Sequence, residues 1–129
     1  MKFLQANLHH AKGASDTFSD KFHYDNISIG LIQEPWVFQG KIRGLKYGNC
    51  KIIYDTSQSV PRTAIMVDPI TNYIVLSKFC SRDLITIVVD VPISWGIREV
   101  ICSSAYFHED DLAPPALVQE LITTQTKIL

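Results

Sequence analysis

Three polar side chains stand where buried strands of this sequence should end, and their types suit chemistry on a phosphate ester. Asn7 follows a short, partly apolar stretch, Glu34 comes directly after the run from Ile29 to Gln33, and Tyr106 lies near the end of a later run. A carboxylate, an amide and a phenol at neighbouring strand ends could hold a hydrated divalent cation and a phosphate. Magnesium prefers oxygen ligands and keeps several waters, so one glutamate can suffice as its first anchor.

Each of these residues also has an ordinary structural interpretation. A glutamate at a strand end is often simply solvated, because carboxylates are mostly exposed. Asn7 could accept a hydrogen bond within its own turn, and Tyr106 could be a half-buried strand aromatic. His9 and His10 could be a surface pair at the start of a helix. The residue types alone therefore leave a functional site and a purely structural role both open.

The chain up to Glu34 predicts a strand, a helix and a second strand. Residues 2–8 alternate loosely and suit a short strand, and an apolar stripe then recurs at helical spacing: Ala11, Ala14, Phe18 and Phe22. Pro35 cannot donate a hydrogen bond within a sheet, so it ends the strand that began at Ile29. Strand, helix, strand favours a parallel pair with a right-handed crossover. Such a pair places Asn7 and Glu34 at the same edge of a sheet, the usual place for a site in an α/β protein.

The rest of the chain predicts short strands and a final helix. Three glycines interrupt residues 37–49, which indicates a loop. Strands are expected at residues 50–55, 63–68, 72–76, 84–91 and 97–108, with a turn at 92–96. The run from Leu84 to Val91 is nearly all β-branched, which is typical of a strand buried on both faces. An amphipathic helix with Asp111 as its expected N-cap continues to the end of the sequence.

Composition indicates one globular domain. The 129 residues are 47% hydrophobic and 19% charged, which suits a single globular domain and not a disordered chain. Neither a signal peptide nor an apolar stretch of membrane-spanning length occurs, so we expect an intracellular protein that is not secreted and not in a membrane. The three cysteines lack metal-ligand spacing and suit a reducing compartment.

Charge is unevenly distributed although the net charge is only −1. Lys41, Arg43 and Lys46 all fall in the glycine-interrupted loop after Glu34. A local basic surface of this kind could contact DNA phosphates by Coulomb attraction and counterion release. Scattered basic residues more often belong to a solvated loop. The charges by themselves therefore do not decide between a DNA-binding surface and such a loop.

Four segments resemble, in order along the chain, the motifs of one family. They are Gln5–Ser15, Leu31–Trp36, Pro61–Ile65 and Ser103–His108, the last followed by Asp110 and Asp111. These segments resemble the endonuclease/exonuclease/phosphatase domains of non-LTR retrotransposons, particularly R1 and Jockey-like elements. The resemblance runs along the whole chain, and its first two motifs together are fairly specific. It implies that residues 1–129 are the N-terminal portion of one such domain, truncated at the C-terminus.

The resemblance implies a fold, a site and partners. The fold would be a four-layer α/β sandwich of the DNase I-like type, of which we expect only the first sheet with its helices, the second half being missing. By the family pattern Glu34 and Asn7 would bind Mg²⁺, Asn7 would orient the phosphate or its water, and Tyr106 would hydrogen-bond the phosphate. The intact domain would nick chromosomal DNA in the nucleus, and a reverse transcriptase domain on the same polyprotein would extend the new end.

Two departures from the family pattern limit the activity that the resemblance implies. His9 stands where related apurinic endonucleases have an aspartate, and histidine is a poor magnesium ligand. The family's Gly-Asp-x-Asn-like segment and its Ser-Asp-His do not occur among these residues. We therefore expect an inactive part of a metal-dependent nuclease, because removing members of a catalytic unit forfeits most of the rate. The alternatives are a catalytically dead retrotransposon-derived remnant and a small α/β binding module.

The missing half also predicts self-association. A first sheet without its partner would expose the inner face of strands such as Leu84–Val91. Exposed apolar faces and sheet edges of this kind favour aggregation or pairing between copies.

Overall fold

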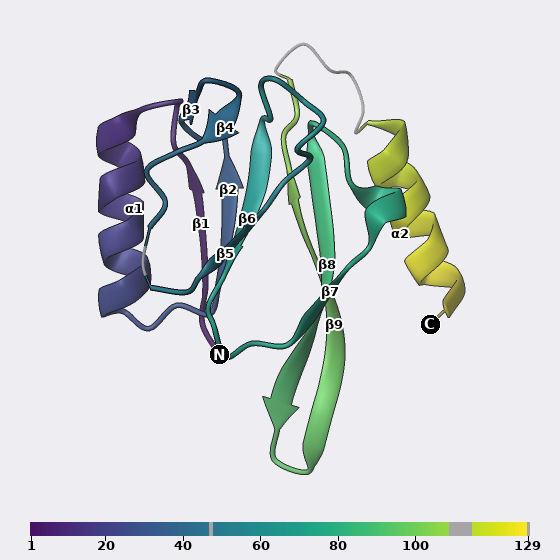
Figure 1. Cartoon of the computed structure of the whole chain (residues 1–129). Helices are drawn as coiled ribbons and strands as arrows, with labels where there is room; N and C mark the ends of the chain where they lie inside the picture. Colours follow the sequence, from purple (N-terminus) through teal and green to yellow (C-terminus); the bar gives the residue numbers. More distant parts are fainter. Residues whose placement is uncertain (47, 109–114, 129) are drawn as a thin grey trace.

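The computed structural model of the chain describes residues 1–46, 48–108 and 115–128. Its elements form four layers, with a helix on the outer face of each of two sheets that face one another (Figure 1). The first sheet has the strand order β1–β2–β6–β5 and the second has β7–β8–β9. The strands of the first sheet are β1 (Phe3–Asn7), β2 (Ile29–Gln33), β5 (Lys51–Ile53) and β6 (Thr63–Val67). Those of the second are β7 (Tyr73–Val75), β8 (Leu84–Ile93) and β9 (Gly96–Ala105).

Two α-helices, a short 3₁₀ helix and a small hairpin complete the described elements. Helix α1 (Lys12–Tyr24) packs on the first sheet, and α2 (Ala116–Ile128) packs on the second together with the short 3₁₀ helix η1 (Ser77–Phe79). Strands β3 (Val37–Phe38) and β4 (Lys41–Ile42) form a separate two-stranded sheet. None of the helices in the described ranges has both the length and the apolar character needed to cross a membrane.

The β1–α1–β2 unit has the predicted parallel arrangement. Residues Phe3 to Asn7 pair with Ile29 to Gln33 in parallel register, and β6 then runs antiparallel to β2. The predicted apolar stripe of α1 is only partly correct, because Ser15 and Ser19 share the buried face with Phe18 and Phe22. Small side chains are needed there because the helix lies close to its neighbours. A Cβ at Gly44 would stand 3.0 Å from Ser15 Cβ, and Ser19 Oγ donates to Gly44 O at 3.0 Å.

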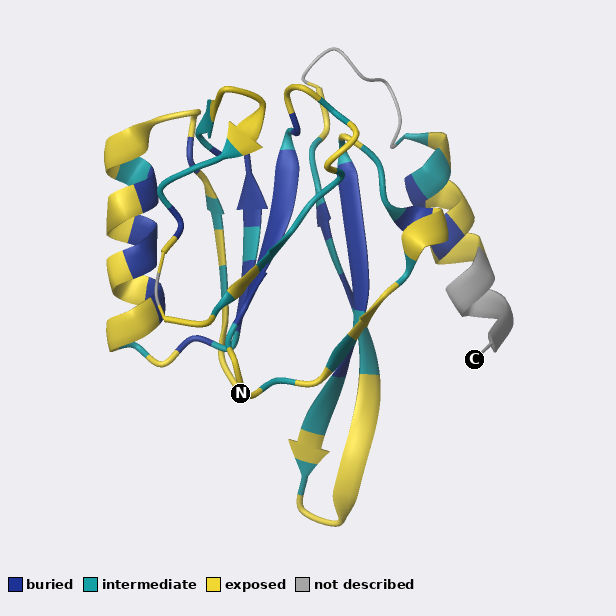
Figure 2. Ribbon diagram, in the orientation of Figure 1, coloured by how far each residue is buried: buried dark blue, intermediate teal, exposed yellow. Residues whose placement is uncertain are grey.

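Most of the space between the two sheets is an apolar core. Ile29, Ile65 and Val67 face it from the first sheet. The second sheet contributes Ile85, Ile87, Val89 and Cys102. Figure 2 shows this buried centre between the sheets. The prediction of an α/β sandwich of this type is therefore confirmed.

The expectation that Leu84–Val91 would expose its inner face was wrong. Strands β7, β8 and β9 build a second sheet within these residues, so Ile85 and Ile87 bury one face of β8 against the first sheet. The opposite face is covered by α2, where Leu84 packs with Val118 and Leu121. Burial on both faces follows the β-branched pattern and covers the face on which self-association was predicted. Self-association through the sheet edges stays a prediction.

Several element ends differ from the sequence prediction; for example, β9 ends at Ala105, so Tyr106 directly follows the strand. Strand β8 continues through Pro92 to Ile93, where a turn was expected, so the β8–β9 hairpin is longer and projects beyond the first sheet (Figure 1). Within the expected loop at residues 37–49, the β3–β4 hairpin turns at Gln39 and Gly40, both with positive φ. The acidic residues 109–111, with Asp111 as the expected N-cap, lie outside the described residues.

Candidate functional site

The carboxyl ends of β1 and β2 place Asn7 and Glu34 at one edge of the first sheet, as the sequence predicted. Asn7 is the register partner of Gln33, the residue before Glu34. The two chain segments remain joined beyond the strands, because Leu8 N donates to Gln33 O at 2.9 Å and His10 N donates to Glu34 O at 2.9 Å. The backbones of the two candidate ligands are therefore held side by side by main-chain hydrogen bonds.

Three residues at this edge adopt a left-handed backbone. The φ angles are 50° at His9, 56° at His10 and 49° at Glu34. This conformation is uncommon for residues other than glycine, and its clustering is a recognised feature of functional sites. The left-handed backbone turns the segments that follow β1 and β2 sharply, directly beyond the edge of the sheet.

The side chain of Glu34 lies against His9. Its Oε2 is 3.5 Å from His9 Nδ1, and the Glu34 side chain is 20% exposed whereas that of His9 is 80% exposed. The amide oxygen of Asn7 accepts a hydrogen bond from His9 N at 2.9 Å. The structural interpretation of Asn7 as a turn residue is thus correct. A carbonyl oxygen has two lone pairs, so this bond does not prevent a further role as a ligand.

Tyr106 is connected to this edge through Arg62. The backbone N–H of Tyr106 donates to Asp83 O at 2.9 Å, and the guanidinium of Arg62 lies 4.6 Å from the centre of the Tyr106 ring. The carbonyl of Arg62 in turn accepts a hydrogen bond from Glu34 N at 2.8 Å. Arg62 therefore contacts both Glu34, through its backbone, and Tyr106, through its side chain.

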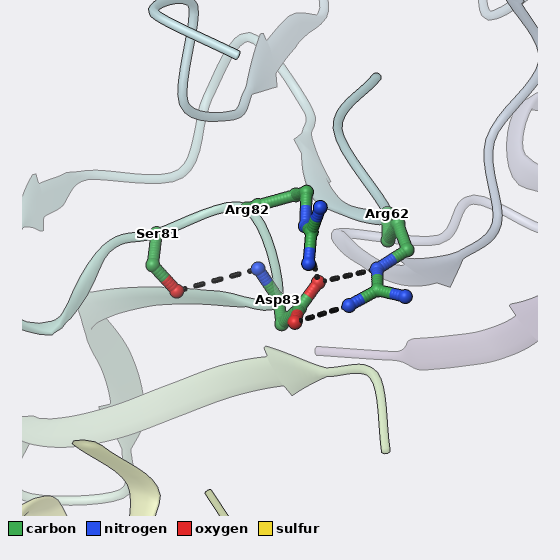
Figure 3. A network of polar contacts seen from close by, with 4 residues as sticks. All are labelled: Arg62, Ser81, Arg82 and Asp83. Atoms are coloured by element: carbon green, nitrogen blue, oxygen red, sulfur yellow. Dashed lines mark hydrogen bonds and ion pairs between the residues drawn. The ribbon is translucent and has the colours of Figure 1, made fainter. Parts of the chain in front are cut away.

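Arg62 also forms a bidentate ion pair with Asp83 (Figure 3). Its Nε and Nη2 donate to the two carboxylate oxygens, each at 2.6 Å, and the side chains are only 23% and 26% exposed. Arg82 Nε adds a 3.3 Å contact to the same carboxylate. Burial by itself would raise the pKa of Asp83, but the hydrogen bonds and positive charge of Arg62, helped by Arg82, hold it below its ordinary value.

Sequence reasoning did not select Arg62 as a site residue. It was visible only as a basic residue within the segment Pro61–Ile65, and its partner lies 21 positions further on. A signal that could have found it is an arginine placed directly before a largely apolar strand, since a charge so close to the core needs a partner.

A buried polar cluster lies beneath the candidate site and joins the two sheets. Ser104 Oγ on β9 accepts from Gln33 Nε2 at 3.0 Å and from Thr63 Oγ1 at 2.6 Å, and it donates to Ile32 O at 2.9 Å. Gln5 Nε2 extends the cluster to β1 by donating to Gln33 Oε1 at 2.9 Å. Fully satisfied buried polar groups of this kind fix a unique geometry. The residue that precedes Glu34 is therefore held rigidly.

The oxygen atoms of Glu34 and Asn7 are of the type that magnesium prefers, but they supply only one carboxylate. Glu34 offers a carboxylate and Asn7 an amide oxygen, both of the hard oxygen type that Mg²⁺ prefers. No cluster of three His, Cys, Asp or Glu side chains arranged for a metal occurs within the described ranges. A single carboxylate matches the way Mg²⁺ is often held in phosphoryl-transfer sites, where water and substrate phosphate supply the other ligands.

The predicted DNA-binding residues fall into two groups. Arg43 and Lys46 line a pocket against α1, together with Trp36 and Phe38. Arg43 is anchored there, because its N donates to Trp36 O at 2.9 Å and its Nε to Phe38 O at 3.3 Å. Lys41 lies on β4 and is exposed, outside the set of residues that line this pocket.

The four layers and the polar edge define an α/β sandwich of the DNase I-like type. No family model and no curated protein matches the chain. Among solved structures it is similar to the endonuclease domain of TRAS1, a telomere-specific non-LTR retrotransposon, with a TM-score of 0.71 and 22% sequence identity. The match covers 98% of this chain and 52% of that one. The resemblance noted in the motifs therefore holds for the fold, and the chain spans about half the length of that structure.

Proposed function

We propose that this chain supplies the metal-anchoring part of a DNA-nicking endonuclease site, and that these residues bind a divalent cation and DNA without cleaving the strand. The observation that carries the proposal is the placement of Glu34 and Asn7 at one sheet edge, joined by backbone hydrogen bonds, with Tyr106 linked to Glu34 through Arg62. The fold shared with a retrotransposon endonuclease domain supports DNA as the partner.

Each residue has a distinct role in the proposed site. Glu34 would hold Mg²⁺ through its carboxylate, with the Asn7 amide oxygen beside it. Magnesium bound there would neutralise negative charge on phosphate oxygens as they approach the transition state. The phenol of Tyr106 would donate a hydrogen bond to a non-bridging phosphate oxygen. Arg62 acts on Tyr106 by covering its ring at 4.6 Å, and Asp83 holds the guanidinium in that position.

The proposed lack of turnover follows from the groups that these side chains can supply. Hydrolysis needs a base for the attacking water and an acid for the leaving oxygen. Glu34 and Asn7 serve as ligands, and Tyr106 serves as a hydrogen-bond donor. The family segments that would bring the acid and base are not found among the 129 residues. In an intact element we propose that a complete domain acts in the nucleus beside a reverse transcriptase of the same polyprotein.

Magnesium binding tests the role of Glu34. We expect Glu34→Gln to weaken Mg²⁺ binding at least tenfold in isothermal titration calorimetry, because the amide keeps the shape of the side chain but loses the charge that attracts the ion. Glu99→Gln, which removes an exposed carboxylate from β9, is the matched control and should bind as the unaltered chain does. Equal affinities for the two variants would refute the metal site.

Plasmid nicking tests the inactivity. Purified chain with Mg²⁺ is expected to leave supercoiled DNA intact on an agarose gel while still retarding DNA in a binding assay. Robust nicking that disappears in Glu34→Ala would show that the chain is a complete enzyme. Nicking that persists in Glu34→Ala points to a contaminating nuclease, and the assay is then repeated on chain purified to constant specific activity.

A further inference from the structure

A pocket of about 530 Å³ lies between helix α1 and the segment that carries the β3–β4 hairpin. The hairpin side carries aromatic and basic side chains, and the helix side carries two carboxylates together with Lys12 at its first turn. The volume falls within the range of small-molecule and nucleotide sites. The pocket includes neither Glu34 nor Tyr106, so its occupant is separate from the candidate metal.

The hairpin side presents an aromatic platform. The rings of Trp36 and Phe38 are stacked, with centroids 6.5 Å apart and planes inclined by 26°. Phe38 is nevertheless 55% exposed. Arg43 fixes the backbone beneath both rings through its two hydrogen bonds to their carbonyls. An exposed ring held rigid by a stacked neighbour is the arrangement on which unpaired nucleic-acid bases stack.

The charges around the platform restrict the occupant further. Lys12, Arg43 and Lys46 line the pocket and can neutralise phosphate. Asp16 and Asp20 on α1 repel phosphate, but carboxylates accept hydrogen bonds from the amino group of cytosine and similar bases. A molecule that is negative at one end and carries amino groups at the other fits both walls. In a duplex both faces of an internal base are covered by the neighbouring base pairs, so a base that stacks on Phe38 must be unpaired.

We propose that this pocket binds an unpaired, amino-bearing nucleotide of a single-stranded nucleic acid. The base stacks on Phe38 and points its amino group toward Asp16 and Asp20, while its phosphate lies near Arg43 and Lys46. The site goes beyond the proposed cleavage site, because it needs no metal and shares no residue with it. The hairpin side of the pocket begins at Trp36, two residues after Glu34 in the sequence, so both sites draw on one continuous segment of the chain.

The two tryptophans of the chain allow a direct measurement. Trp95 is 85% exposed at the tip of the β8–β9 hairpin, so Trp95→Phe leaves Trp36 as the sole tryptophan reporter. In buffer with EDTA, we expect a short oligo-dC to quench Trp36 fluorescence and an oligo-dT to bind about fivefold more weakly. Phe38→Ala in the same background should weaken oligo-dC binding about tenfold, the loss of one stacked base. Tyr24→Ala, which removes another exposed ring at the far end of α1, is the control.

The salt dependence of binding, and the comparison of single-stranded with duplex DNA, provide a second test. Lys46→Ala should flatten the dependence of oligo-dC affinity on salt concentration, since one phosphate contact is lost. The proposal is overturned if duplex DNA quenches Trp36 as well as the single strand does, or if Phe38→Ala and Tyr24→Ala bind alike. It is also overturned if no oligonucleotide quenches. Because EDTA removes metal from every arm, each of these results leaves the magnesium proposal for Glu34 standing.

Discussion

Replacing Arg62 with methionine is expected to lower the free energy of unfolding by about 3 kcal/mol, roughly a hundredfold change in the folding equilibrium. Methionine keeps the length and packing of the side chain. It removes both 2.6 Å hydrogen bonds to Asp83 and leaves that carboxylate, only 26% exposed, without its main partner. A largely buried carboxylate that keeps only its weaker contact with Arg82 is the costly outcome, and the lost contact with the Tyr106 ring adds to it.

Urea denaturation followed by circular dichroism measures this loss. Arg98→Met on β9 removes an exposed arginine and is the matched control, with an expected change within about 0.5 kcal/mol. The double variant Arg62→Met/Asp83→Asn should recover part of the stability, because no unpaired charge remains. A loss for Arg62→Met no larger than that for Arg98→Met would show that the pair contributes nothing.

The same pair makes stability depend on acid. The pKa of Asp83 in the folded chain lies below its ordinary value, so the unfolded chain takes up the proton first as pH falls. The contribution of Asp83 is fully present above about pH 4, the unfolded pKa, and is lost as pH falls through the lower folded pKa. Asp83→Asn should flatten this part of the pH profile. Asp25 and Asp55 also have lowered pKa values, through hydrogen bonds with Lys21 and Ser57 respectively, so some acid sensitivity should persist.

The predictability of the fold depends on how local each signal is. The β1–α1–β2 unit was predictable because its strand and helix patterns, and Pro35 as a terminator, lie within adjacent residues. The burial of β8 was visible in its β-branched run, but its partner was not, since the alternation of Ile85 and Ile87 does not say which surface covers them. The packing of the two sheets on each other depends on contacts such as the hydrogen bond between Gln33 on β2 and Ser104 on β9, which are 71 residues apart. No short sequence pattern predicts contacts over such a separation.

The candidate site likewise has a part that local sequence patterns predict and a part that only the folded structure shows. Asn7 and Glu34 could be placed together from the sequence, because parallel strands end at the same edge. Their actual geometry depends on left-handed residues at His9, His10 and Glu34. Only a few per cent of residues other than glycine adopt positive φ, so the sequence does not predict it at these positions, although histidine is among the types enriched there. The role of Arg62 arises only when β6 and the start of β8 meet in space.

Replacing His9 with aspartate is expected to tighten magnesium binding about 30-fold. Nδ1 of histidine and Oδ1 of aspartate are the same number of bonds from the backbone, so the new carboxylate should lie near the position that Nδ1 holds, 3.5 Å from Glu34 Oε2. A second negative charge about 4 Å from a divalent ion contributes roughly 2 kcal/mol at the dielectric constant of water. Aspartate also tolerates the left-handed backbone at position 9. Without metal the two carboxylates repel, so the variant should melt at a lower temperature in EDTA and regain stability as Mg²⁺ is added.

A matched charge change separates this local effect from a general one. Gln39→Asp places a carboxylate at another exposed residue with positive φ, 53°, in the β3–β4 turn. It should leave magnesium affinity within about twofold of the unaltered chain, because the added charge lies away from Glu34 and is screened by salt. Equal gains in His9→Asp and Gln39→Asp would mean that magnesium responds to net charge alone. A gain confined to His9→Asp, and lost when Glu34→Gln is added, would identify the edge formed by β1 and β2 as the place where the ion binds, with His9 as the residue that weakens it in this chain.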